Sequence, residues 1–227
     1  MLEAPDGRTG TAIALERIPD IVITDVMMPG MDGYEVCTAL KADERTSHIP
    51  VVMLTAKSGT ESRIQGIETG ADAYIGKPFV QQELFAVTDN LLKTRRLLQE
   101  KYSRTDTGGL TKPEALPSLE KKFLDRVLSA IQQRLGDELF GADQLAADIG
   151  LSRTQLHRKL KALLNKSPGD LIRSIRLEHA RHLLRHKTAT VSEVANRVGF
   201  GSPASFSASF SRHFGFPPSE AAQQETP

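Results

Sequence analysis

The chain has 227 residues, of which 39% are hydrophobic and 25% charged, a composition typical of a globular protein with room for two ordinary domains. Its single cysteine, Cys37, excludes an internal disulfide and a multi-cysteine zinc site. No apolar run approaches the roughly 20 residues of a membrane span and no signal-peptide pattern begins the chain, so we expect a soluble, cytoplasmic protein.

Charge is distributed unequally along the chain. Residues 1–100 contain 10 Lys and Arg against 15 Asp and Glu, a net charge of −5, whereas residues 101–227 contain 19 against 13, a net charge of +6. This asymmetry indicates that the second half alone meets a polyanion. On composition alone, the alternative is that the surface charges are segregated by chance.

A stretch without periodicity divides the chain. Residues 81–101 place apolar side chains at helical spacing, and the residues that follow are rich in Ser, Thr, Gly and Pro. Periodicity resumes after Ser118, which can cap a helix. We therefore predict a first domain over 1–101, a linker over 102–117 and a second domain over 118–222.

The first half alternates short β-rich runs with helical patterns. The runs are Ile21–Thr24, Val51–Leu54 and Ala73–Ile75, and the helical patterns lie at about 33–43 and 60–69. This alternation predicts an α/β fold with a parallel sheet. In such sheets the chemistry lies at the carboxyl ends of strands, where this sequence has Asp25, Thr55 and Lys77.

Three motifs accompany these residues, namely 25–33 (DVMMPGMDG), 54–56 (LTA) and 70–79 (GADAYIGKPF). In order and spacing they resemble the receiver domain of two-component response regulators, a flavodoxin-like fold, over residues 1–100. The resemblance implies that Asp25 accepts a phosphoryl group from a histidine kinase, while Thr55 and Lys77 hold the phosphoryl oxygens. It also implies a cis peptide before Pro78 and a switch role for Tyr74, which ordinary packing could equally explain.

The same resemblance implies a Mg²⁺ ion, with Asp25 and the backbone carbonyl of Met27 among its ligands. Receivers complete this site with two adjacent acidic residues after their first strand, and this sequence lacks that strand and that pair. Residues 2–7 (LEAPDG) match the end of the family's second strand and the start of its second helix. We therefore expect a truncated receiver with an incomplete parallel sheet, read as a fragment or misplaced start of a longer protein. A degenerate receiver used only for protein contacts is the alternative.

The second half is predicted to be all-α, with two helix-turn-helix units. Capping boxes at 152–155 (SRTQ) and 190–193 (TVSE), and Ser-Pro pairs at 167–168 and 202–203, mark four helix starts. They delimit one unit at about 143–164, a long helix at 168–185 and a second unit at 191–213. Such units place their second helix in a DNA major groove.

Residues 152–161 (SRTQLHRKLK), 194–200 (VANRVGF) and 206–210 (FSASF), with Phe214, Gly215 and Pro218, resemble the AraC/XylS family of DNA-binding domains. The resemblance covers about residues 118–220. A receiver joined to such a domain is similar to the cytoplasmic end of hybrid two-component regulators. The implied partners are double-stranded DNA and a histidine kinase, on the same longer chain or separate, and a homodimer is left open.

The residues expected to contact DNA lie on the outer faces of the two recognition helices, whereas Leu156 and Leu160 face inward. They are Arg153, Thr154, His157, Arg158 and Lys161 in the first helix, and Ala204, Ser205, Ser207 and Arg212 in the second. Arginine suits bidentate contact with guanine, and Thr154 suits a thymine methyl group. The small side chains of the second helix predict weaker base readout there. A solvated charged face is the alternative for any one of these cations.

The favoured function is a DNA-binding transcription regulator tuned by phosphorylation of Asp25. A phosphorylation-independent regulator with a degenerate receiver is the second candidate. An enzyme with an aspartyl nucleophile, such as a haloacid-dehalogenase-type phosphatase, is disfavoured because that chemistry uses a second Asp two residues later, where Met27 stands.

Overall fold

The computed structural model describes residues 1–56, 69–103, 118–186 and 189–223, and structural statements refer to these residues. The chain splits into two compact units, one built around a sheet in the first half and one helical in the second. Among the helices described, none is both long and apolar enough to cross a membrane.

A three-stranded parallel sheet is the centre of the first unit. Its strands are β1 (Val22–Asp25), β2 (Val51–Thr55) and β3 (Ala73–Gly76), in the order β1-β2-β3. Asp25 pairs in register with Leu54, and Thr55 with Gly76. The predicted parallel α/β sheet is confirmed, and its carboxyl ends meet at one edge.

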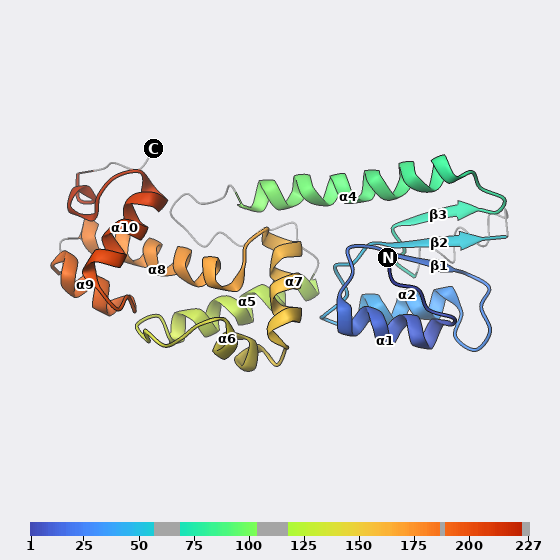
Figure 1. Ribbon diagram of the computed structural model, residues 1–227, viewed down its shortest axis with the longest axis horizontal. Helices are drawn as coiled ribbons and strands as arrows, with labels where there is room; N and C mark the ends of the chain where they lie inside the picture. The colour runs from blue at the N-terminus through green and yellow to red at the C-terminus, as the bar shows by residue number, and fades with distance from the viewer. Residues whose placement is uncertain (57–68, 104–117, 187–188, 224–227) are drawn as a thin grey trace. The chain divides into compact units, whose positions relative to one another are not determined.

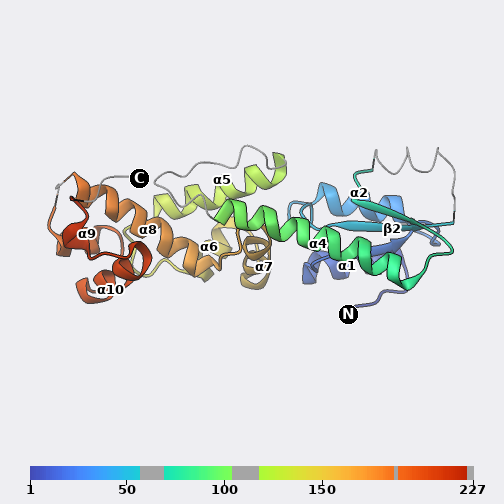
Figure 2. The same cartoon turned by 90° about the horizontal axis from the view of Figure 1, so that it is seen from above.

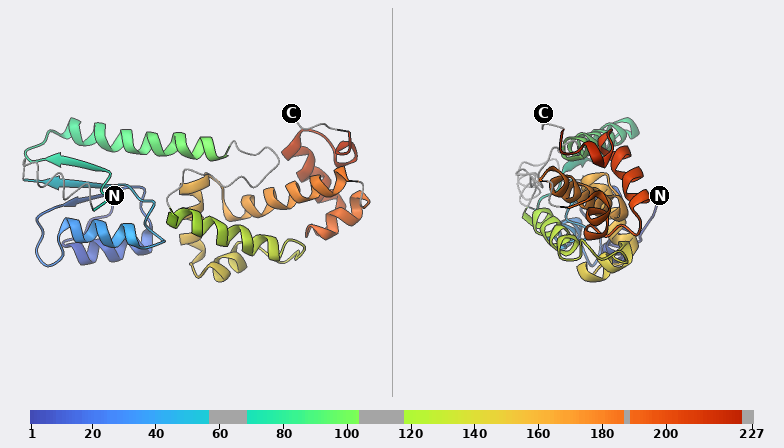
Figure 3. Two further views of the ribbon diagram at one scale, coloured as in Figure 1. Left: turned by 180° about the vertical axis from the view of Figure 1, so that it is seen from behind. Right: turned by 90° about the vertical axis from the view of Figure 1, so that its left-hand side faces the viewer.

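Helices cover both faces of this sheet, as Figures 1 and 3 show. Helices α1 (Gly7–Arg17) and α2 (Gly33–Ala42) lie on one face, and α4 (Gln81–Ser103) runs along the other. The core beneath α1 and α2 consists of Ala14, Val26, Val36, Cys37, Leu40, Val51 and Met53. The helix predicted at 60–69 falls almost wholly outside the described residues, as does most of the linker predicted at 102–117.

The start of α2 is fixed against the end of β1. Asp32 and Glu35 form a capping box, in which each carboxylate accepts the other residue's backbone N–H, at 2.8 and 2.9 Å. The Gly33 N–H donates to the Val26 carbonyl at 3.1 Å. A Cβ at Gly33 would lie 2.3 Å from the Asp25 carbonyl oxygen, so only glycine permits this approach.

The second unit is helical throughout. Its elements are α5 (Ser118–Gln133), α6 (Ala142–Ile149), α7 (Arg153–Leu164), α8 (Pro168–Arg185), α9 (Val191–Arg197), α10 (Pro203–Phe214) and the short η1 (Pro218–Glu220). Figure 2 shows α8 passing from the α6–α7 pair at one end to the α9–α10 pair at the other. Both helix-turn-helix units and the long helix between them are therefore present as predicted.

The two helix-turn-helix turns have the same construction. Gly150 follows α6 with φ of +78°, and the Leu151 N–H donates to the Ala146 carbonyl at 3.0 Å. Gly199 follows α9 with φ of +73°, and the Phe200 N–H donates to Ala195 at 3.0 Å. A left-handed backbone favours glycine at both turns.

The predicted caps of this unit are confirmed with one difference. The side chains of Ser152, Ser167, Thr190 and Ser202 each accept a backbone N–H three residues later, at 3.1 to 3.3 Å. Ser118 is the first residue of α5 rather than the cap before it, a shift within the usual variation of helix ends.

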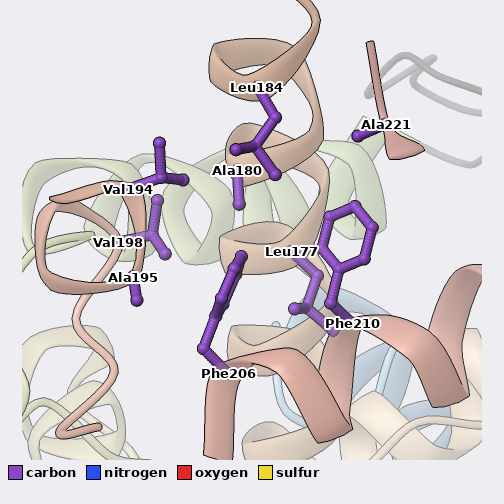
Figure 4. Packing of buried hydrophobic residues seen from close by; sticks show 9 residues of the cluster. All are labelled: Leu177, Ala180, Leu184, Val194, Ala195, Val198, Phe206, Phe210 and Ala221. Carbon is purple, nitrogen blue, oxygen red and sulfur yellow. The ribbon is translucent and has the colours of Figure 1, made fainter. Parts of the chain in front are cut away.

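A cluster of apolar side chains joins α8, α9, α10 and the segment after η1, as Figure 4 shows. Its buried members are Leu177, Ala180, Leu184, Val194, Ala195, Val198, Phe206, Phe210 and Ala221. The Phe206 ring lies edge-on to Phe200, with centroids 5.3 Å apart, and 5.6 Å from Phe210. These contacts fix α10, the second recognition helix, against α8.

One guanidinium holds the connection between α5 and α6. Arg176 of α8 donates to the backbone carbonyls of Leu135 and Phe140, at 3.2 and 3.4 Å, and to that of Asp137. A Cβ at Gly199 would lie 2.7 Å from the Leu135 carbonyl and 3.0 Å from this guanidinium. The turn after α9 and the α5–α6 connection therefore meet at Arg176.

Candidate phosphoacceptor site and nucleic-acid interface

Asp25 and Lys77 meet at the carboxyl edge of the sheet. Asp25 is the last residue of β1, and its Oδ1 accepts the Met27 N–H at 3.1 Å. Its Oδ2 forms an ion pair with the Lys77 ammonium. The Asp25 and Lys77 side chains are 33% and 37% exposed, so a solvent-borne group can reach both.

Lys77 is positioned by the strand beside it. Its backbone N–H donates to the Thr55 carbonyl at 2.7 Å, extending the β2–β3 pairing by one residue. The Lys77–Pro78 peptide is cis, as the family resemblance implied. Thr55 ends β2 and is 7% exposed. The structure thus brings Asp25 and Lys77 into contact, with Thr55 at the end of the strand between them.

Tyr74 lies further from the strand ends. Its ring is half-buried against the core beneath α1 and α2, and its hydroxyl lies 3.4 Å from the Thr69 hydroxyl, where either can donate. Burial raises the Tyr74 pKa, against a lowering by the Thr69 hydrogen bond. This placement is compatible with a switch residue and equally with ordinary packing, so the switch role remains a prediction.

The Asp25 carboxyl is held in its ionised form. Partial burial raises its pKa, but the Lys77 side chain and the Met27 and Val26 N–H groups together lower it further, so the net shift is downward. Asp25 therefore presents a carboxylate at neutral pH, the form that acts as a nucleophile.

The first recognition helix, α7, has one apolar and one polar face. Leu156 and Leu160 are fully buried, and the predicted DNA contacts are all exposed, namely Arg153, Thr154, His157, Arg158 and Lys161. At its start, the Ser152 N–H donates to Gln155 Oε1 at 3.0 Å, completing the capping box. The helix therefore packs against its domain through Leu156 and Leu160 and exposes a basic face to solvent.

The second recognition helix presents little charge. Phe206 and Phe210 are fully buried, while Ala204, Ser205 and Arg212 are exposed. Ser207, expected on the outer face, is only half-exposed. It follows Phe206 directly, so it lies at the margin of the buried stripe.

Two contacts of α7 were not anticipated from the sequence. Asp143 of α6 pairs with the Arg153 guanidinium, with Asp143 Oδ2 and Arg153 Nη1 3.2 Å apart. Lys159 is fully buried, with its Nζ 4.4 Å from the centroid of the Phe123 ring. The helical periodicity places Lys159 beside Leu156 and Leu160, a signal that could have indicated its burial, whereas the Asp143 contact depends on the tertiary fold.

Comparison with known proteins agrees with this division of the chain. The model of the response regulator receiver domain matches residues 1–89, and the model of a helix-turn-helix domain matches residues 145–224. The chain is 35% identical over 192 residues to the DNA-binding dual master transcriptional regulator RpaA of Synechocystis, covering 80% of this chain and 73% of that protein. The chain belongs to the response regulators. Its first domain is a receiver and its second an AraC-type helix-turn-helix domain.

This response regulator is also similar to a histidine kinase and to a solved AraC-type structure. It is 36% identical over 221 residues to histidine kinase P4 of Formosa agariphila, covering 97% of this chain but only 16% of that protein's length. A crystal structure of an AraC-type transcriptional regulator from Chromobacterium violaceum is 28% identical, covers 48% of this chain and 96% of its own, and has a TM-score of 0.44.

The two matched domains indicate the general role of this regulator. A receiver joined to a helix-turn-helix domain is the organisation of a two-component response regulator that acts on transcription.

Receiver domains commonly bind Mg²⁺, and the strand-end groups among the described residues do not fit that ion. Among the described residues, no group of three or more His, Cys, Asp or Glu side chains could hold a metal. Asp25 contributes one carboxylate, and its oxygens already accept the Met27 N–H and contact Lys77. Mg²⁺ is usually held by one or two carboxylates with waters completing its octahedron, and here the one carboxylate at the strand end is already paired with Lys77.

Proposed function

We propose that this response regulator is a cytoplasmic, sequence-specific DNA-binding protein whose affinity for its site is tuned by phosphorylation of Asp25 in an intact receiver. The observation that carries the DNA-binding part is the face of α7, where the predicted contact residues are exposed over buried Leu156 and Leu160. The kinase would lie on the same polypeptide or a separate one. The similarity to histidine kinase P4 supports the first arrangement.

In this proposal α7 carries most of the base readout. Arg153 and Arg158 can each bond O6 and N7 of a guanine, and Lys161 at the helix end can meet a phosphate. The exposed part of α10 offers Ala204 and Ser205, which suit close approach and contact with methyl groups. Helix α8 has 18 residues and so measures about 27 Å, which suits two readers placed near one DNA turn of about 34 Å apart.

The phosphorylation step would use the strand-end groups. A carboxylate oxygen of Asp25 attacks the phosphorus of a phosphohistidine, the P–N bond breaks, and the imidazole leaves with its electron pair. An acyl phosphate forms on Asp25, and Lys77 and Thr55 stabilise the charge on its oxygens. In-line transfer depends on positioning, and the pairing of β1 with β2 and of β2 with β3 supports the proposal by holding the strand ends side by side.

A second candidate function is DNA binding without phosphorylation, with the receiver used for protein contacts. It is favoured by the strand-end site, because no group of three or more His, Cys, Asp or Glu side chains among the described residues could hold Mg²⁺. The two candidates differ in whether modification of Asp25 changes DNA affinity.

The DNA-binding proposal is tested by titrating the full chain with random duplex DNA and with duplexes selected from a randomised library. A basic face that touches about six phosphates predicts a slope of log affinity against log salt near −5. Arg158→Ala should weaken the selected site more than random DNA if Arg158 reads a base, and both equally if it meets only phosphate. Affinity that does not change with salt would contradict the proposal.

The phosphorylation proposal is tested by Mg²⁺-dependent labelling with acetyl phosphate. The chain as it stands should label poorly at Asp25, because few carboxylates are available to the ion, and a version joined to a receiver's first strand and acidic pair should label well. Asp25→Asn is the blank for both. If the labelled version binds its selected DNA no differently from the blank, the second candidate function holds. Strong labelling of the chain as it stands, abolished in the blank, would refute the expectation about the metal.

A further inference from the structure

A carboxylate lies beside the proposed DNA-reading face of the first helix-turn-helix unit. Asp143, in the first turn of α6, places its Oδ2 3.2 Å from Nη1 of Arg153, the first residue of α7. The two residues are ten positions apart, so the turn at Gly150 brings them together. The other predicted contact residues of α7 are cationic or neutral, so Asp143 adds a negative charge beside a surface suited to phosphates.

The Asp143–Arg153 pair is not a stabilising feature of the fold. The side chains are 68% and 69% exposed, and ion pairs that are so open to water contribute little to stability. A carboxylate at this place also repels the DNA backbone, which lowers affinity for every sequence. Asp143 also stands in the first turn of α6, where a carboxylate favours the helix start. What it adds to DNA recognition lies in its contact with Arg153.

We infer that Asp143 is a positioning residue that aims the Arg153 guanidinium at one base pair, so that it sets sequence discrimination at the expense of general affinity. This rests on the proposed function, in which α7 reads the major groove. A guanidinium has five N–H donors, and Asp143 engages one nitrogen, Nη1. The remaining edge stays available for O6 and N7 of a guanine.

The ion pair becomes more effective once DNA is bound. Entry into the groove removes water from both side chains, and a hydrogen-bonded pair is held more firmly in a lower dielectric. A long side chain that is already directed loses less conformational freedom on contact with its base. A neutral residue at 143 leaves Arg153 able to slide to a neighbouring base or phosphate.

Asp148 supplies a matched control. It lies on the same helix, and its Oδ1 is 3.4 Å from the Arg134 guanidinium, with the two side chains 30% and 45% exposed. Arg134 follows the end of α5 and is not among the predicted DNA contacts. Asp148→Asn therefore makes the same change of charge on α6 without touching a reading residue.

The experiment uses the full chain and duplexes selected by it from a randomised library. Each guanine of the selected site is replaced in turn by 7-deazaguanine, which lacks the N7 acceptor, and the position sensitive to Arg153→Ala is identified. Asp143→Asn should bind random DNA more tightly and lose about fivefold in discrimination at that position. Asp148→Asn should keep the discrimination, and Asp143→Glu should restore part of it. On the Arg153→Ala background, Asp143→Asn should cause no further loss.

Several results would overturn the inference. If Asp143→Asn and Asp148→Asn change affinity for all sequences alike, Asp143 acts through net charge alone. If the losses from Asp143→Asn and Arg153→Ala add, Asp143 contacts a base itself, such as a cytosine amino group. If no guanine is sensitive to Arg153→Ala while the chain still selects a site, this inference fails and the proposed function stands. If the wild-type chain selects no sequence, the proposed function fails as well.

Discussion

Replacement of Phe206 by alanine tests whether α10 is held by the aromatic cluster. Phe206 is fully buried, lies edge-on to Phe200 and contacts Phe210, and Figure 4 shows it opposite Leu177 of α8. Truncation of a buried phenylalanine to alanine removes about 3–5 kcal/mol from the free energy of unfolding, because transfer free energy is lost and a cavity remains. Aromatic pairs contribute about 0.5–1.5 kcal/mol each beyond burial, so the upper half of that range is expected here.

The expected loss of about 4 kcal/mol is a large fraction of the 5–15 kcal/mol that stabilises an ordinary domain. In urea, with a dependence of about 2 kcal/mol per molar, the unfolding midpoint of the second unit should fall by about 2 M. Circular dichroism of the helices, with hydrogen exchange of residues 206–214, would follow that unit. Leu139→Ala is the control within the same unit, because Leu139 is 82% exposed and its truncation should change stability by less than about 0.5 kcal/mol. A loss below about 1 kcal/mol at Phe206 would refute the assignment of this cluster as the anchor of α10.

Three other changes probe the first unit and a helix cap. Gly33→Ala should destabilise the receiver by about 2 kcal/mol or more because its Cβ would meet the Asp25 carbonyl, whereas Gly10→Ala, whose nearest contact is 3.5 Å away, should be neutral or stabilising in urea melts. Burial raises the pKa of the Cys37 thiol from 9.0 to about 11. The buried neutral thiol therefore contributes fully to stability below pH 9.0, and this contribution is lost as the pH rises through 11. Cys37→Ala should remove that alkaline loss from the urea midpoint. Thr190→Ala should cost about 1 kcal/mol of unfolding free energy by removing the bond to the Glu193 N–H, and an unchanged thermal midpoint would show that the cap is not needed.

Local signals carried most of the correct predictions. The cap residues and glycines of both helix-turn-helix turns lie next to the groups they satisfy, so their types and spacing define the helix starts without knowledge of the fold. Asp25, Thr55 and Lys77 could be placed at one edge because parallel strands bring their carboxyl ends together. Their roles remain predictions, because geometry alone does not assign a chemical step.

What could not be predicted depends on contacts between elements. Asp143 meets Arg153 across a turn, and Arg176 meets carbonyls about forty positions earlier in the chain. Main-chain carbonyls carry no sequence signal, because every residue has one. The periodicity of α7 could indicate that Lys159 is buried, but its contact with the Phe123 ring depends on how α5 packs on α7.

The hydrogen bonds from Arg176 to the α5–α6 connection determine where this regulator tolerates sequence change. The three acceptors are backbone oxygens, so these bonds hold the path of the α5–α6 connection whatever the side chains at the acceptor residues. Within that connection, Leu139 is 82% exposed. Leu139 can therefore be replaced, or carry an epitope or a fluorophore, while the spacing of the helices on either side is preserved. Gly136 cannot, because a Cβ there would lie 2.9 Å from the Arg197 carbonyl oxygen. Arg176 itself cannot be replaced by lysine, because an ammonium is a point charge and the three carbonyls require the planar fork of donors of a guanidinium.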